Sequence, residues 1–506
     1  MEKYVTLTVN GVPRSVPYNT LLSDAMDMEK PCGGHGRCGK CKVKVKGEVS
    51  DVTPQEQRCL SYSELLSGFR MACLTYVLGD CDAYIGVSNG SEQIISEAPH
   101  VSEIRNPIFE KYGVSIDIGT TTIAARLYDD TGSILSEYCG INPQQKWGAD
   151  VISRIEHALS GNERQLSASI REEIGRIIKE LASLANIASE TIDAVVITGN
   201  TVMLSLLADE SVEPFSHAPF APVRLFGEQF TASVLSIDSL SGDTPIYLPP
   251  CISAFVGADI TCAILSCNLM SADCAMLVDI GTNGEIALVN EGQLIAASTA
   301  AGPAFEGAGI HMGMRAKDGA IDRVSVVNGA LSIHTVGEKD PIGICGSGLV
   351  DSVAAMLELG VLDESGYLEN DDYFLNSDVI IKQNDIRMVQ LAKSAICAGL
   401  ITLLKNSGVS IDELSKFYIA GGFGNYLNMD SAAAIGLFPR QLAEKAEAIG
   451  NSALAGASMI LLDKSKFEEA REITKNAKAV DLAGNSCFTE HYIMGMIFSE
   501  TECNGF

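Results

Sequence analysis

Basic residues are scarce in this chain of 506 residues: 36 Lys and Arg stand against 64 Asp and Glu, which gives a formal net charge of −28. A surface of this sign repels the phosphates of nucleic acids and anionic lipid headgroups. The sequence therefore predicts no nucleic-acid partner and no membrane partner. Almost the whole acidic excess lies downstream of residue 90. Two interpretations of it, plain solubility and attraction to a protein partner, remain open.

Long apolar runs and a leader segment are also missing. No apolar run approaches the roughly 20 residues that span a bilayer, and the first residues, MEKYVTLTVNG, are typical of a strand and turn rather than of a signal peptide. Aromatic residues make up only 6%, while the hydrophobic content of 46% suits ordinary α/β cores. Fifteen cysteines in so long a chain do not indicate a secreted disulfide scaffold. We therefore expect a cytoplasmic, reducing location in which some cysteines bind metal.

The N-terminal cysteines are spaced like the ligands of an iron–sulfur cluster. Residues 4–10 and 13–17 alternate as two strands around Asn10-Gly11, a strong hairpin signal. The segment PCGGHGRCGKC then places three cysteines in a glycine-rich loop, and a fourth follows in GFRMACLTYV before another strand. Glycines let such a loop wrap around a cluster whose irons are held by thiolates. The pattern predicts a [2Fe–2S] cluster in which Cys32, Cys38 and Cys41 are ligands and a more distant cysteine is the fourth.

Zinc is the main alternative, but zinc sites more often use two Cys-x2-Cys pairs and only one is present. Cys59 and Cys81 are alternative fourth ligands. The loop resembles that of [2Fe–2S] ferredoxins, with a first spacing one residue longer than in the plant form, and RMAC before a strand favours Cys73 by the same resemblance. It implies a ferredoxin-like β-grasp domain over residues 1–88. Residues 89–112 are polar and interrupted by Pro, which predicts a linker, with a loop packed against the next domain as the alternative.

Two similar hairpins follow, SIDIGTTTIAARL at residues 115–127 and VDIGTNGEIAL at residues 278–288. Asp117 and Asp279 precede the turns, and a strand-end carboxylate is suited to hold Mg²⁺ through water. Turn glycines, N–H groups and hydroxyls can cradle phosphates; the residues concerned are Gly119, Thr120, Thr121, Thr122, Gly281, Thr282 and Asn283. Two copies in successive halves predict a duplicated fold that clamps one nucleotide, with halves at residues 113–273 and 274–506.

Other turns in this region could also contact a ligand. Gly199-Asn200-Thr201 joins a strand to a helix, and Asp259 begins a helix where it could orient an attacking water or merely cap the helix. The loop at 300–314 is glycine-rich and carries Glu306 and His311. Gly346 and Ser347 open a helix whose N-terminus could face phosphate or base, and Gly421, Gly422 and Gly424 form a turn suited to adenosine. Helices are predicted from near residue 148 and over residues 163–184.

The motifs DIGTTT, VDIGTNGE and AGGFG are similar to the phosphate and adenosine motifs of the sugar-kinase, actin and chaperone-ATPase superfamily. With GNTVM, AGPAFEGA, GICGSGL and the N-terminal loop, the whole chain resembles the reductive activators of corrinoid proteins. The resemblance implies an α/β, actin-like (ribonuclease H-like) ATPase fold behind the ferredoxin domain, with a [2Fe–2S] cluster, ATP and Mg²⁺ as cofactors. It implies ATP-dependent reduction of a cob(II)amide to cob(I)amide in a methyltransferase system. The partners would be the corrinoid protein and a cytosolic electron donor, and a homodimer is left open.

Three alternatives share parts of this pattern. A small-molecule kinase with a redox-sensing ferredoxin domain would use a similar clamp and an acid near Asp259. An activator of radical dehydratases would share the clamp but bind a [4Fe–4S] cluster between subunits, which the single N-terminal loop disfavours. A chaperone-like ATPase would carry the cluster for structure alone.

Overall fold

The computed structural model describes residues 3–26, 28, 30, 34, 36, 41–60, 65, 68–84, 99 and 104–499. The chain divides into two compact units. Unit 1 comprises Met1–Glu92 and Pro143–Asn162, and unit 2 comprises Gln93–Asn142 and Glu163–Phe506. Unit 1 thus includes a segment that lies in sequence between two elements of unit 2.

Unit 1 is built on one mixed sheet with the strand order β2-β1-β6-β4-β5, and β3 pairs with β6. The strands are β1 (Tyr4–Val9), β2 (Val12–Pro17), β3 (Thr20–Leu21), β4 (Lys42–Val49), β5 (Phe69–Met71) and β6 (Tyr76–Tyr84). β1 runs parallel to β6, while its pairing with β2 confirms the predicted hairpin. The helical segments are α1 (Leu22–Ala25), α2 (Pro54–Cys59), η1 (Pro143–Lys146), α4 (Val151–His157) and η2 (Ala158–Asn162).

Unit 2 contains two six-stranded sheets that share the topology of five strands and differ in where the sixth is added. The first has the order β11-β12-β10-β7-β8-β9 and the second β22-β21-β13-β14-β15-β23. In each, three antiparallel strands (β7-β8-β9 or β13-β14-β15) are followed by two parallel strands beside the first (β10 and β12, or β21 and β22). This repeat confirms the predicted duplicated, actin-like fold.

The strands of the first sheet are β7 (Tyr112–Ile118), β8 (Thr122–Asp129), β9 (Ile134–Ile141), β10 (Ala194–Gly199), β11 (Glu228–Thr231) and β12 (Pro245–Leu248). Those of the second are β13 (Cys274–Ile280), β14 (Gly284–Asn290), β15 (Gln293–Thr299), β21 (Lys416–Ala420), β22 (Ala446–Gly450) and β23 (Ala477–Ala479). Smaller sheets join β16 (Ala320–Val327) to β17 (Ala330–Thr335) and β18 (Gly343–Ile344), and β19 (Asp372–Phe374) to β20 (Ile380–Lys382).

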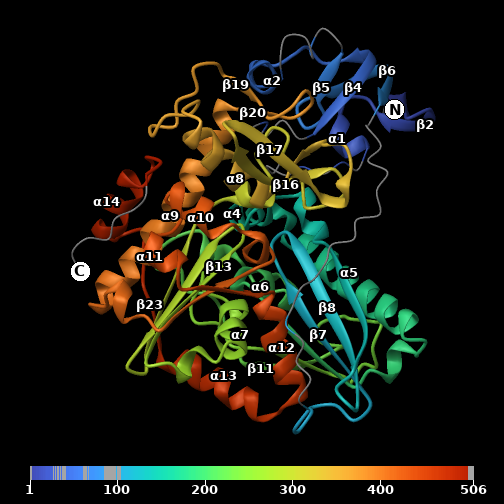
Figure 1. Ribbon diagram of the computed structural model, residues 1–506. Coiled ribbons are helices and arrows are strands. Elements are labelled where there is room, and N and C mark those ends of the chain that lie inside the picture. The colour runs from blue at the N-terminus through green and yellow to red at the C-terminus, as the bar shows by residue number, and fades with distance from the viewer. Residues whose placement is uncertain are drawn as a thin grey trace. The chain divides into compact units, whose positions relative to one another are not determined.

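Two helices, α7 (Ala258–Ser266) and α12 (Ser452–Leu462), pack against each other and lie between the two sheets (Figure 1). Their apolar residues join side chains of β10, β13 and β14 in one buried cluster. Gly456 permits the close crossing, because a Cβ there would lie 2.0 Å from the carbonyl oxygen of Cys262. The remaining α-helices of unit 2 are α5 (Glu163–Leu184), α6 (Thr201–Ala208), α8 (Gly346–Glu358), α9 (Gln383–Ser407), α10 (Met429–Ala434), α11 (Arg440–Ala443), α13 (Ser465–Asn476) and α14 (Ser486–Met494).

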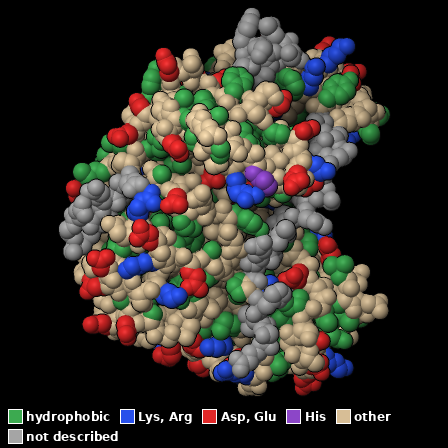
Figure 2. All heavy atoms as spheres, in the orientation of Figure 1, with side chains coloured by type: hydrophobic (Ala, Val, Ile, Leu, Met, Phe, Trp, Pro, Cys, Tyr) green, Lys and Arg blue, Asp and Glu red, His purple; other side chains and the backbone are tan. Residues whose placement is uncertain are grey.

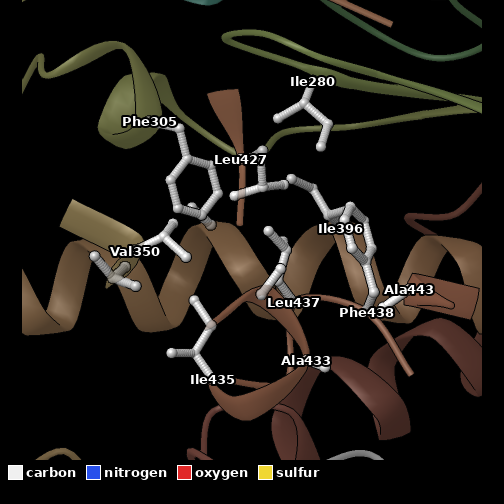
Figure 3. Packing of buried hydrophobic residues seen from close by; sticks show 14 of the residues in the cluster. Ile280, Phe305, Val350, Ile396, Leu427, Ala433, Ile435, Leu437, Phe438 and Ala443 are labelled. Atoms are coloured by element: carbon white, nitrogen blue, oxygen red, sulfur yellow. The ribbon is translucent and has the colours of Figure 1, made fainter. Parts of the chain in front are cut away.

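A second buried cluster fills the C-terminal half of unit 2. It brings together Phe305, Val350 of α8, Ile396 of α9 and the segment around Leu437 and Phe438 (Figure 3). Among the described helices, α9 alone is long and apolar enough to cross a membrane, and 83% of its most apolar window is buried inside the fold. That burial is typical of a core helix, and its apolar face is accounted for by packing.

The described end of the predicted linker is bonded to unit 2. Residues 105–110 donate backbone N–H groups to Leu461, Leu462 and Asp193, and Lys464 donates to Asn106. On the visible face in Figure 2, acidic and basic side chains are interspersed rather than gathered into a basic patch.

Candidate nucleotide and cluster sites

The two predicted phosphate hairpins meet inside unit 2. The first turn joins β7 to β8 and the second joins β13 to β14. The hydroxyl oxygens of Thr121 and Thr282, one from each turn, lie 3.3 Å apart. Thr282 in turn donates a hydrogen bond to Oε2 of Glu306, at 2.5 Å. The structure therefore brings together turns that are far apart in sequence, and it adds Glu306 to them.

Asn142 holds the first turn through two hydrogen bonds, and it was not predicted from the sequence. Its backbone N–H donates to the carbonyl of Thr121 at 3.0 Å, and its Nδ2 donates to the carbonyl of Gly119 at 2.9 Å. The side chain is fully buried, so these bonds form away from competing water. Nothing in the sequence marks it, because a single Asn before Pro143 is too common to single out.

Four carboxyl groups gather beside the turns: Asp117, Asp259, Asp279 and Glu285. Asp279 and Glu285 are direct partners across β13 and β14. Burial raises the pKa of Asp117 to about 7, against the lowering effect of its Asn451 hydrogen bond. Burial and the nearby Asp259, Asp117 and Glu306 raise the pKa of Asp279 to about 8. Burial and the nearby Asp259 and Asp279 raise the pKa of Glu285, and burial raises that of Asp259.

In the described part of the chain, no three Asp, Glu, His or Cys side chains are placed to hold a metal ion together. A hydrated divalent cation beside one or two of these carboxylates would relieve the repulsion between like charges in low dielectric. Asn451 orients one of them: its Nδ2 donates to Oδ2 of Asp117 at 3.0 Å, while its Oδ1 caps α12 at Leu454 N–H. Asn451 and Glu285 were not selected from sequence. Asn451 is a helix cap of common type, and Glu285 stood within a recognised motif without a signal of its own.

Asp259 and Asn200 both lie at the start of a helix in the first half of unit 2, but only one of them caps its helix. Asp259 is not the cap of α7, since Gly257 holds that position; its Oδ1 accepts the backbone N–H of Ile260 at 2.8 Å. Asn200 does cap α6, accepting the Val202 N–H at 3.0 Å. Its buried side-chain amide also faces the Glu285 carboxyl and acts to lower the pKa of that group, against the raising effect of burial.

The predicted adenosine turn lies against the second hairpin. Gly421 has φ +91°, and a Cβ there would lie 2.9 Å from Oδ1 of Asp279, so only glycine allows the turn to approach this carboxylate. Gly422 faces open space, whereas Gly424 packs on Ile419. At the start of α8, the Ser347 hydroxyl donates to the carbonyl of Asp322 and Gly346 packs on the carbonyl of Phe305. The structure thus places the turn at residues 421–424 beside the second phosphate hairpin. The Ser347 hydroxyl, by contrast, already donates its hydrogen bond within the protein.

In unit 1, the two described candidate ligands, Cys41 and Cys73, are neighbours. Their Sγ atoms lie 3.2 Å apart, and the residues are 2% and 5% exposed. Backbone pairing fixes this geometry, because Ala72 N–H donates to the carbonyl of Cys41. Two buried thiols at this spacing fit ligands of one metal centre. Cys32 and Cys38 lie outside the described residues, and Cys59 donates to the carbonyl of Gly36.

A buried ion pair holds the strand that delivers Cys73. Arg70 donates from Nε and Nη2 to Glu56 at 2.8 and 3.0 Å, and the N–H of Met71 donates to the same carboxylate at 3.1 Å. Burial alone would raise the pKa of Glu56, but these hydrogen bonds hold the pKa below its ordinary value. The pair fixes β5 against α2, so Cys73 follows a rigid strand.

The fold and these sites define a class of protein in which a ferredoxin-like unit is joined to a duplicated actin-like unit. Family models agree: residues 7–78 match the "2Fe-2S iron-sulfur cluster binding domain", residues 112–272 match the "RACo middle region", and residues 273–506 match the "C-terminal domain of RACo the ASKHA domain". The chain therefore has a cluster-binding domain and an ATP-binding domain of known types.

Curated relatives narrow the class. The chain is 34% identical to "Corrinoid activation enzyme RamQ" of Eubacterium limosum, covering 96% of this chain and 97% of that protein. It is 28% identical to a "[Co(II) methylated amine-specific corrinoid protein] reductase" of Methanosarcina barkeri over 76% of each. A solved structure described as "Reductive activator for corrinoid,iron-sulfur protein" superposes with a TM-score of 0.72, at 27% identity, and covers 98% of this chain and 99% of that one. The chain belongs to the family of reductive activators of corrinoid proteins, as its motifs predicted.

Proposed function

We propose that this chain uses ATP to drive the one-electron reduction of a corrinoid protein from cob(II)amide to cob(I)amide within a methyltransferase system. One observation carries the proposal. A single chain contains both a cluster-binding unit and a duplicated nucleotide-clamp unit, and the likeness to corrinoid activators extends over 96% of its length. Neither unit by itself would distinguish this activity from those of plain ferredoxins or small-molecule kinases.

In unit 1, the proposed thiolate ligands are Cys32, Cys38, Cys41 and Cys73. Held by these thiolates, a [2Fe–2S] cluster supplies one-electron redox chemistry. The chain's own contribution is to fix Cys73 through the Glu56–Arg70 pair and to bury the Cys41 and Cys73 thiols away from water. The domain boundaries expected from sequence, 1–88 for this domain, 89–112 for the linker and 113–273 and 274–506 for the two clamp halves, belong to the same proposal.

In unit 2, Asp117 and Asp279 would hold Mg²⁺ and Asp259 would orient a water for attack on the terminal phosphate. The phosphates would be cradled by the two turns, through Gly119, Thr120, Thr121, Thr122, Gly281, Thr282 and Asn283. The adenosine would lie against Gly421, Gly422 and Gly424, with Gly346 and Ser347 lining the same side. The meeting of Thr121 with Thr282 and the approach of Gly421 to Asp279 support this arrangement.

ATP is needed because the reduction is uphill. A one-electron equilibrium shifts tenfold per ~59 mV, so a gap of about 200 mV would leave on the order of one reduced cobalt per few thousand. A nucleotide can change this ratio only if it binds one state of the complex more tightly than another. We therefore propose that closure of the clamp favours the complex in which the cobalt is reducible. The electron would come from a cytosolic donor in the cytoplasm, and self-association as a homodimer remains to be measured.

The test is reduction of a cob(II)amide protein by the full chain with a reduced electron donor, followed by the cobalt absorbance. We expect reduction when MgATP is present and little when ATP is omitted. Equal yields with and without ATP would contradict the coupling. ATP turnover stimulated by a small sugar or acid, and not by a corrinoid protein, would favour the kinase alternative.

A further inference from the structure

The hydroxyls of Thr121 and Thr282, both in the proposed phosphate cradle, form a chain of hydrogen bonds that ends at the carboxylate of Glu306. Thr282 donates its proton to Oε2 of Glu306 at 2.5 Å, and its oxygen lies 3.3 Å from that of Thr121. A hydroxyl has one proton to donate. Because Thr282 uses its proton on Glu306, Thr121 must be the donor between the two threonines. The relay therefore runs from Thr121 to Thr282 to Glu306, and both hydroxyls point their protons towards the carboxylate.

The turn that carries Glu306 is tied to the same hairpin by its backbone. Gly302 N–H donates to the carbonyl of Thr282 at 2.9 Å, directly before the short helix η6 (Pro303–Glu306). Glu306 also contributes to raising the pKa of Asp279, after burial and the two aspartates nearby, which places its charge beside the proposed cation site. The carboxylate thus accepts from the hydroxyl donors that a phosphate would use, beside the proposed cation site.

The neighbouring residue keeps the turn in place. Phe305 is 3% exposed, stacks on Phe423 with ring centroids 5.1 Å apart, and projects into the core with Val350 and Leu427 (Figure 3). Phe423 belongs to the proposed adenosine turn. Because Phe305 holds the backbone of this turn, the Glu306 side chain can rotate without moving the turn. A substitution at Glu306 should therefore affect only its own side chain.

We propose that Glu306 is an internal competitor for nucleotide phosphate: its carboxylate accepts the Thr282 hydroxyl directly and orients the Thr121 hydroxyl through it, and a bound phosphate must displace it. This inference rests on the proposed function, because it requires a nucleotide at these turns. It makes Glu306 a residue that weakens nucleotide affinity. The opposite role, a carboxylate that helps hold Mg²⁺ and so strengthens affinity, is the competing outcome.

The sign of the effect separates the two roles. Binding of ADP and of the ATP analogue with an imido group between the β- and γ-phosphates would be measured by calorimetry on the full chain, at several Mg²⁺ concentrations. Glu306→Ala removes the acceptor and the charge, and Glu306→Gln keeps a weaker, neutral acceptor. Glu358→Gln, on the exposed side of α8, is the matched control for loss of one negative charge.

We expect Glu306→Ala to lower Kd by about tenfold, as for the loss of one charge-assisted hydrogen bond, and by a similar factor at each Mg²⁺ concentration. Glu306→Gln should fall between it and the wild-type chain, and Glu358→Gln should match the wild type. Unchanged or weaker binding by Glu306→Ala would overturn the proposal; weakening that grows with Mg²⁺ would assign Glu306 to the metal. If the wild-type chain itself binds no nucleotide, the proposed function fails and the competitor role with it.

Discussion

Cysteines in unit 1 differ in what surrounds their sulfur atoms. Cys41 and Cys73 are buried with their Sγ atoms 3.2 Å apart, while Cys59 is half-buried and donates to the carbonyl of Gly36. Cys41→Ser and Cys73→Ser should each abolish or strongly reduce cluster content, because a hydroxyl is a poor replacement for a thiolate ligand of iron. The measurement is iron and acid-labile sulfide per chain, with the visible absorbance.

Cys59→Ser serves as the control and should keep the wild-type iron content. If Cys59→Ser lost the cluster and Cys73→Ser kept it, the choice of the fourth ligand would be wrong.

Removing the charge of Asp279 is expected to weaken MgATP binding and to raise the thermal stability of the chain. The carboxyl is packed among three other acidic groups, which raise its pKa together with burial. Asp279→Asn keeps the shape and removes the charge, so it should weaken MgATP binding by tenfold or more while raising the melting temperature by roughly 2 °C or more, the shift that about 1 kcal/mol produces in a large domain. Calorimetric titration and thermal unfolding of the same samples check both signs. A variant that both binds and unfolds like the wild type would contradict the proposed role of Asp279.

Residues with a motif could be found from sequence, whereas those without one could not. Asp117 and Asp279 were found because each stands before a Gly-Thr turn and the pattern occurs twice. Asn142 and Asn451 act on the same site, but they reach it from elements whose positions depend on tertiary packing. Glu285 lies within the second motif, opposite Asp279, and was missed because the motif gave it no signal of its own. A cap at Asn451 is visible in sequence, yet its second bond to Asp117 spans 334 residues, and no local pattern encodes that contact.

At the scale of elements, the spacing of apolar residues predicted helices, whereas their exact ends and their crossings depend on contacts that the spacing does not show. The helix expected at 163–184 is α5 (Glu163–Leu184). The helix expected near residue 148 instead begins at Val151, because the side chain of Asp150 accepts the Ser153 N–H at 2.7 Å and caps it there. The crossing of α7 with α12 had no sequence signal, since it depends on a glycine that meets a backbone far away in sequence.

That crossing gives a prediction for Gly456. An added Cβ would lie 2.0 Å from the carbonyl oxygen of Cys262, which is backbone and cannot move aside cheaply. Gly456→Ala should therefore destabilise unit 2 by about 1–3 kcal/mol through overpacking, despite the better helix propensity of alanine. Denaturant unfolding measures the change. Gly242→Ala, where the nearest atom would be 3.7 Å away, is the control and should unfold within about 0.5 kcal/mol of the wild type.

A buried lysine on α9 gives a prediction for pH. Lys393 is 1% exposed, donates to the carbonyl of Ile497 at 2.6 Å and lies 5.0 Å from the Phe498 ring centroid. Burial lowers its pKa to about 8. Between pH 8 and the ordinary pKa near 10.4, the unfolded chain binds a proton that the folded chain does not, so this group makes the folded state more stable as pH rises.

The free energy of unfolding of the wild type should therefore rise relative to that of Lys393→Met as pH increases from 7.5 to 9.5, by up to about 2 kcal/mol. Lys478→Met, at an exposed position on β23, should show no such pH-dependent difference. A difference between wild type and Lys393→Met that stays constant with pH would show that Lys393 keeps its proton through this range.

At the scale of the whole molecule, each unit has its own core, and only unit 2 contains the nucleotide turns. A ligand that binds the folded state stabilises the part that holds it, by about 2.7 kcal/mol at a concentration of 100 Kd. Heating should therefore give two transitions, one seen as bleaching of the cluster absorbance and one as loss of helical signal. MgATP should raise the second by several degrees and leave the first unchanged.

The Asp279→Asn variant is the control, because its helical transition should no longer move with MgATP. A common shift of both transitions in the wild type would contradict the separation, since it would mean that the two units unfold as one cooperative block. Independent transitions would also limit the mechanism. Nucleotide binding could then act on electron transfer only in the proposed complex with the corrinoid protein, because in the free chain its stabilisation would not reach the cluster-bearing unit.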